Sequence, residues 1–137
     1  MAIRRSIGYR NSDARWSAFD GGTARINVYT GTQPAAAELG ASGTLLGTLT
    51  PSSDVFGTPA NGAAALNSVA SDSSADNSGT AGWCRIYRTG DTAPGSAAAS
   101  TDLRIDLAIG SDISIDNASI VAGGIIALSG WTMTETA

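Results

Sequence analysis

Hydrophobic side chains recur at every second position through most of the chain after residue 24. In ARINVYTG (residues 24–31), Ile26 and Val28 alternate with polar or aromatic neighbours, and Gly31 closes the segment. Successive side chains of a β-strand point to opposite faces, so a period of two indicates strands, whereas an amphipathic helix repeats every 3.6 residues. The pattern predicts an all-β fold, with residues 24–30 as a half-buried strand.

Several later segments have the same alternation and are predicted to be strands: residues 44–50 (stopped by Pro51), 82–89, 102–109, 112–116 and 125–134, the last after a turn at Gly123-Gly124. In GWCRIYRT, Trp83 and Arg85 are expected on one face, and Cys84 and Ile86 on the other. Two short strands in residues 51–81 bring the count to about eight. That number, at this spacing, is typical of a single β-sandwich or jelly-roll-like domain.

The first 23 residues differ from the remainder of the chain. Residues 10–22 (RNSDARWSAFDGG) read as a short helix that Asn11 or Ser12 can cap and Gly21-Gly22 ends. We therefore divide the chain into a basic N-terminal arm with a short helix (residues 1–23) and one β-domain (residues 24–137).

Charge is distributed unevenly along the sequence. All eight cations are arginine. Residues 1–25 hold five arginines against two aspartates, a net charge of +3, and the remainder holds three arginines against ten carboxylates, a net charge of −7. A basic arm on an acidic body suits docking of one end on a partner. The acidic body would repel nucleic acid, so we expect no direct nucleic-acid binding.

The composition disfavours most catalytic and cofactor sites. Histidine is absent, which removes the usual general base and the commonest zinc ligand. A single cysteine, Cys84, allows no internal disulfide and has no histidine to activate it, so we expect it buried and unreactive. There is no run of 18 apolar residues and no apolar segment after the first arginines, so we expect neither a membrane span nor a secretory signal. We predict no enzyme activity, metal or cofactor.

Two groups of carboxylates are candidate sites. DSSADNSG (residues 72–79) spaces oxygens as a calcium loop does, but the sixth position is not glycine and the twelfth is Trp83, so a solvated turn fits better. A glycosidase pair could be drawn from the predicted outward strand positions Asp102, Asp106, Asp112 and Asp116. No aromatic-lined cleft is apparent for such a pair, and solubilising edge charges are the preferred interpretation.

The three tryptophans, Trp16, Trp83 and Trp131, have two interpretations. Their bulk suits the filling of a core that is otherwise built from small side chains. Tryptophan is also enriched among the residues that anchor interfaces.

The order of four segments resembles a family of small virion proteins of tailed bacteriophages. The segments are INVYTGTQPA (26–35), GTLLGTLT (43–50), SADNSGTAGWCRIYRTGD (74–91) and DNASIVAGGIIALSGWTMTE (116–135). The resemblance covers most of residues 24–135 and departs in residues 89–112. It implies a capsid decoration (cement) protein, with a tail component (tube, terminator or fibre-associated protein) as the alternative.

The resemblance also implies the partners and the location of the protein. The expected partners are the major capsid protein and other copies of the chain, as a homotrimer, in a virion assembled in the host cytoplasm. The candidate partner-binding residues are the arginines of the arm, which would lie on acidic capsid surface or on a neighbouring subunit: Arg4, Arg5, Arg10 and Arg15.

Overall fold

The computed structural model describes residues 24–51, 63–65, 69–99, 102, 104–110, 113–130 and 132–134. Within these residues the protein is all-β: ten strands are present, no helix is present, and every pairing between strands is antiparallel. The arm and its predicted helix lie outside the described residues. The all-β class expected from the sequence is confirmed.

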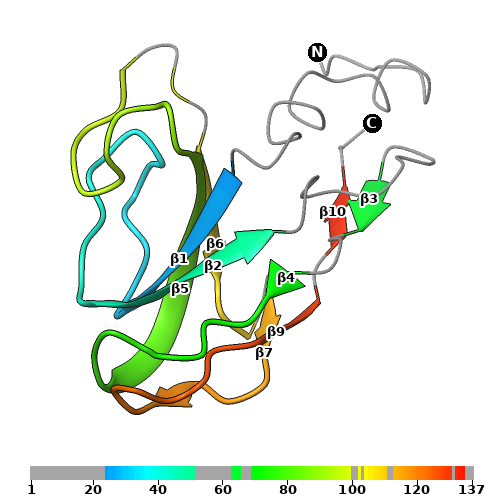
Figure 1. Ribbon diagram of the computed structural model, residues 1–137. Helices are drawn as coiled ribbons and strands as arrows, with labels where there is room; N and C mark the ends of the chain where they lie inside the picture. Colours follow the sequence, from blue (N-terminus) through cyan, green and yellow to red (C-terminus); the bar gives the residue numbers. More distant parts are fainter. Residues whose placement is uncertain are drawn as a thin grey trace.

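One six-stranded sheet organises the described residues, in the order β4-β2-β1-β5-β6 with β8 also paired to β5 (Figure 1). Two short ladders, β10–β3 and β7–β9, accompany it. The strands are β1 (Ala24–Thr30), β2 (Leu45–Pro51), β3 (Ala63–Ala65), β4 (Val69–Ala70), β5 (Gly79–Arg88), β6 (Arg104–Ala108), β7 (Ser114–Ile115), β8 (Ser119–Ile120), β9 (Leu128–Gly130) and β10 (Thr132–Thr134).

The register of β1 on β5 sorts the side chains into two faces. Ile26 lies opposite Ile86 and Val28 opposite Cys84, so apolar side chains gather on one face. The segment between β6 and β10 covers this apolar face and contributes buried side chains of its own. The fully enclosed core residues are Ala24, Ile26, Val28, Leu46, Leu49, Ala75, Ala81, Cys84, Ile86, Leu107, Ile113, Ile120 and Ile126.

The opposite face of the sheet is also buried, which corrects the expectation of a half-buried first strand. Asn27 and Tyr29 are only 4% and 5% exposed, and Trp83 and Arg85 are not exposed at all. Two loops, residues 31–44 and 89–99, lie over this polar face (Figure 1). A period of two in the sequence gives the orientation of the side chains, but not whether loops cover the second face.

Two of the predicted strands have different boundaries in the structure. Pro51 is the last residue of β2 and pairs with Val69, instead of standing beyond the strand. The strand expected over residues 125–134 begins only at Leu128, where β9 starts, β10 lies in its later part, and Ile125 is exposed. The turn at Gly123-Gly124 is confirmed: Gly123 has a φ of 83°, and the Gly124 N–H donates to the carbonyl oxygen of Val121.

Candidate functional site

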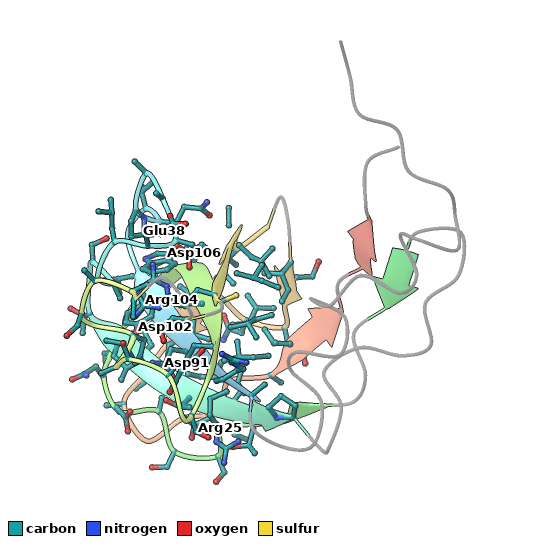
Figure 2. All side chains as sticks on the ribbon, turned by 90° about the horizontal axis from the view of Figure 1, so that it is seen from above. Arg25, Glu38, Asp91, Asp102, Arg104 and Asp106 are labelled. Atoms are coloured by element: carbon teal, nitrogen blue, oxygen red, sulfur yellow. The ribbon has the colours of Figure 1, made fainter. Side chains whose placement is uncertain are left out.

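The two loops over the polar face are joined to each other through their backbones. The Ala98 N–H donates to the Glu38 carbonyl oxygen at 2.7 Å, and the Ala41 N–H donates to the Pro94 carbonyl oxygen at 3.0 Å. Each loop leaves the sheet from a different strand, so these bonds close them into one cover. Figure 2 labels several of the charged side chains of this region, among them Glu38, Asp102, Arg104 and Asp106.

Beneath the cover, Arg85 and Asp106 form a bidentate ion pair. Arg85 Nε and Nη2 donate to the two carboxylate oxygens of Asp106 at 2.7 and 2.8 Å, and the side chains are 0% and 5% exposed. The register of β5 on β6 places these two residues directly opposite each other. Arg85 Nη1 also donates to the Pro94 carbonyl oxygen at 2.8 Å, which attaches the cover to the sheet. The prediction that Asp106 is an outward, solubilising charge is therefore wrong.

Aromatic rings pack around this ion pair. The rings of Tyr29 and Trp83 stack with centroids 4.7 Å apart, and Arg85 Cζ lies 5.3 Å from the Trp83 ring centroid. A guanidinium over an indole face gains from the ring quadrupole. Trp83 is fully buried, so the interior-filling interpretation holds for it, whereas Trp16 and Trp131 lie outside the described residues.

A second hydrogen-bonded network lies on the same face, where Asn27 pairs with Arg85 across the two strands. Asn27 Nδ2 donates to the Tyr29 hydroxyl at 3.0 Å, and Asn27 Oδ1 accepts from Thr48 Oγ1 at 2.8 Å and from the Tyr87 hydroxyl at 3.3 Å. Burial raises the pKa of Tyr87 above its ordinary value, and the nearby Tyr29 adds to this effect. These groups satisfy one another, which is the condition for burying polar atoms without a large desolvation cost.

Arg104 holds the rim of the cover. Its Nη1 donates to the carbonyl oxygens of Ala37 and Leu39, both at 3.4 Å, and its Nη2 donates to those of Thr92 and Ala93 at 3.3 and 3.1 Å. Because these acceptors belong to both loops, one guanidinium bridges them. The bonds are longer than the Arg85 bonds, so the rim is held less firmly than the interior.

A cavity of about 200 Å³ opens beside this rim. Its lining residues are Ala37, Glu38, Ala98, Asp102 and Arg104. Hydrogen bonds from the Thr92 side chain and the Ala99 N–H lower the pKa of Asp102, so its carboxylate is ionised at neutral pH. The cavity combines two carboxylates with a guanidinium that is already bonded to carbonyls. That arrangement offers charges of both signs for binding.

The aspartate-rich segment in residues 72–79, for which the sequence favours a solvated turn over a calcium site, is organised by hydrogen bonds within the chain. Asp72 Oδ1 accepts from the Ser74 N–H at 2.9 Å, and Asp72 Oδ2 accepts from the Thr48 N–H at 3.1 Å. Gly47 makes this approach possible, because a Cβ at that position would collide with the Asp72 carboxylate and the Ile126 side chain. Within the part of the chain that the structure describes, no cluster of three or more His, Cys, Asp or Glu side chains is placed to hold a metal ion.

At the end of the sheet where β5 begins, two large apolar side chains are exposed. Val121 and Ile125 are 66% and 67% exposed and flank the turn at Gly123. The turn is anchored to the segment before β5: the Gly123 N–H donates to the Ala75 carbonyl oxygen, the Ala75 N–H donates to the Gly124 carbonyl oxygen, and the Ala122 N–H donates to Ser78 Oγ, each at 2.8 Å. The two side chains are therefore presented on a well-anchored turn.

Three aspartates lie beside this turn along the backbone. Asp72 and Asp116 form backbone hydrogen bonds with Ile126 and Ala127, and Asp76 follows Ala75. Asp76 and Asp116 are exposed, and Asp72 is half-buried. Neither residues 71–80 nor residues 114–128 contain a cation. We name Asp72, Asp76, Asp116, Val121 and Ile125 the acidic pole.

The opposite end of the sheet is where the arm joins β1. Ala24 pairs with Arg88 there, and Tyr87 pairs with Arg104. An ion pair with Asp91 at 2.8 Å raises the pKa of Arg88. The predicted partner-binding residues belong to the arm and lie outside the described residues: Arg4, Arg5, Arg10 and Arg15.

The remaining candidates separate into different environments. Cys84 is buried within β5, as expected. Asp102 lines the cavity, Asp116 belongs to the acidic pole, and Asp112 lies outside the described residues. The three described aspartates of this group, Asp102, Asp106 and Asp116, thus lie in different environments.

Comparisons with known proteins give no relative for this arrangement. No protein-family model, no curated protein and no solved structure matches the chain. Among the described residues there is no helix long and apolar enough to cross a membrane.

Proposed function

We propose that the protein is a structural component of a tailed-phage virion, a decoration protein that binds and stabilises the expanded capsid. The observation that carries the proposal is the separation of charge along the sheet. The arginine-rich arm joins one end, and the cation-free acidic pole with its two exposed apolar side chains lies at the other. Charges of opposite sign at the two ends of the sheet suit a protein that functions by binding partners through its surface.

The polar face supports the same proposal. The strongest ionic groups described there, Arg85 and Asp106, are committed to each other and to holding the cover. The charged side chains of this face therefore stabilise a rigid body. A rigid body loses little conformational entropy on docking, which favours repeated weak contacts across a large shell.

The proposal includes three further features of the protein. They are a complete second sheet facing the first, as in a sandwich or jelly roll, a short helix in residues 10–22, and a homotrimer on the major capsid protein. A tail component remains the second candidate, because opposite charge at the two ends of a subunit also suits stacking into rings or tubes. Rings or tubes of the purified protein in negative-stain images would favour the tail.

The test is binding to undecorated expanded capsids. Purified protein is mixed with the capsids, the particles are pelleted, and occupancy is measured at two salt concentrations. We expect saturable binding that deletion of residues 2–10 weakens, and that added salt weakens more for the intact protein than for the deletion. An Asp54→Asn variant alters charge in the body and serves as the control. Absence of binding to any capsid would overturn the proposal.

A further inference from the structure

We infer that the acidic pole is the docking surface for the basic arm of a second copy of this chain, so that copies associate head to tail. The inference deepens the proposed function and rests on it for the role of the arm as a binding element. The inference assigns a partner to Val121 and Ile125, the most exposed large apolar side chains of the described residues. The proposed capsid contact is made through the arm and does not involve these two side chains.

The first reason is the apolar pair itself. Val121 and Ile125 are the most exposed large apolar residues described, and they flank one hydrogen-bonded turn. Isolated exposed apolar residues are common, but a neighbouring pair on a well-anchored turn is typical of an interaction surface. Because hydrogen bonds to Ala75 and Ser78 already fix the turn, docking costs little further ordering.

The second reason is the charge around the pair. Asp76 and Asp116 are exposed carboxylates, and the surrounding segments contain no cation. A partner that carries cations together with apolar groups would therefore complement this surface. The first 23 residues of the chain carry both: four arginines are present together with apolar side chains such as Ile3, Ile7 and Trp16. The other strongly charged cluster, around Arg104 and Asp102, contains both signs and has no such preference.

The third reason is the position of the two surfaces. The arm joins the sheet at Ala24, opposite Arg88 at the end of β5, and the acidic pole lies beyond Gly79 at the start of β5. Ten residues of strand separate these ends by about 30 Å. An arm that binds its own acidic pole would have to run back along the whole sheet, whereas the pole of a neighbouring copy can be placed directly beside it.

The two surfaces differ, so their contact is heterologous. Such contacts generate closed rings when the rotation between copies closes, and open filaments when it does not. A stable interface covers about 800 Å² on each partner, more than two side chains provide. The arm must therefore supply much of the contact area, and Val121 and Ile125 act as anchors within it.

The experiment measures self-association without capsids. Sedimentation velocity over a range of protein concentrations should show a reversible oligomer that salt dissociates. Replacing both anchors, Val121→Ser with Ile125→Ser, should weaken association and raise the dissociation constant about a hundredfold. Leu39→Ser is the matched control, because Leu39 is 49% exposed but lies in the cover over the polar face. Circular dichroism melting confirms that each variant is folded.

Charge exchange tests the pairing directly. Asp76→Arg with Asp116→Arg should weaken association, as should Arg4→Glu with Arg5→Glu in the arm. A chain that carries all four changes should recover much of the lost association, because the charges are again complementary. Recovery would not be expected if the four residues served only folding or solubility.

A mixed disulfide separates contact between copies from contact within one chain. Asp76→Cys and Arg5→Cys proteins are prepared separately, mixed and oxidised; the native Cys84 is buried and contributes little background. A covalent dimer of the two variants supports the inference. The inference is overturned if the protein is a monomer at all concentrations or if the anchor variants associate like the wild type. A chain that carries both Asp76→Cys and Arg5→Cys is the control, and a disulfide that forms only within this chain, and not between the two single variants, also overturns the inference. Capsid binding by such a monomer would leave the proposed function intact.

Discussion

The two faces of the central sheet are both buried, but by different means. The apolar face is covered by a segment that adds its own aliphatic side chains, among them Ile113, Ile120 and Ile126. The polar face is covered by loops that add mainly backbone carbonyls, which accept hydrogen bonds from arginines of the sheet. The first arrangement depends on the area removed from water, and the second on the positions of individual atoms.

This difference predicts different responses to substitution. Aliphatic packing loses stability in proportion to the groups removed and to the cavity that is left. A buried ionic network tolerates the loss of one partner poorly, because the other charge is left without compensation. The apolar face should therefore respond gradually, and the polar face abruptly.

The largest effect is expected from Asp106→Ala. It leaves the Arg85 guanidinium buried without its counter-charge, and we expect unfolding to become easier by about 3–5 kcal/mol. Urea unfolding followed by tryptophan fluorescence measures it. The double variant Arg85→Met with Asp106→Leu should recover most of this loss, because no charge then remains buried. A double variant as unstable as Asp106→Ala would show that the loops, and not the desolvated charge, dominate the loss.

On the apolar face, Ile86→Ala should cost about 2–4 kcal/mol, and Ile86→Val about 1 kcal/mol, because both leave part of a closed core empty. The same urea experiment applies. Hydrogen exchange should stay unchanged in residues 31–44 and 89–99 relative to the other protected amides, since this face does not touch the cover. Selective loss of protection in the two loops would contradict the separation of the faces.

The period of two in the sequence was enough to predict the strands around Ile26, Trp83 and Ile105 and the orientation of Ile86 and Cys84. Those features depend on neighbouring residues along one strand. The burial of Asn27 and Arg85 could not be derived in this way. It requires knowing that two distant loops meet over the sheet, and glycine-rich loops carry little local signal about where they pack.

The candidate site shows the same limit. Asp106 stands at an outward position of its strand pattern, which is usual for a solubilising charge, and its pairing with Arg85 depends on the register between β5 and β6. Arginine in the middle of an otherwise apolar strand was the available signal, because a charge at such a position requires a partner. The exposure of Val121 and Ile125 had no counterpart in the sequence pattern, which indicates only apolar residues around a turn.

A smaller effect is expected from Arg104→Ala. Its four bonds to loop carbonyls are long, so we expect a loss of only about 1 kcal/mol in global stability. Exchange of the Ala41 and Ala98 amides, which join the two loops, should nevertheless rise clearly. Arg104→Lys keeps the charge but reaches fewer carbonyls, so its amide exchange should lie between that of the wild type and that of Arg104→Ala. Unchanged exchange of both amides in Arg104→Ala would mean that the loops hold each other without the guanidinium.

The smallest effect concerns alkaline pH and again separates the faces. The pKa of Tyr87 is raised above 10.0 chiefly by burial, so the folded protein retains this proton more firmly than the unfolded chain. The resulting stability is present below pH 10 and is lost as the pH rises through the folded-state pKa. Tyr87→Phe should cost less than about 1 kcal/mol at neutral pH, because Asn27 Oδ1 still accepts from Thr48. Above pH 10 the variant should lose less stability than the wild type, as measured by urea midpoints at matched pH values. Ile86→Val, on the face without an ionisable tyrosine, is the control and should follow the wild-type pH curve with a constant offset. Parallel curves for Tyr87→Phe and the wild type would show that the hydroxyl is not held in the folded state as the structure indicates.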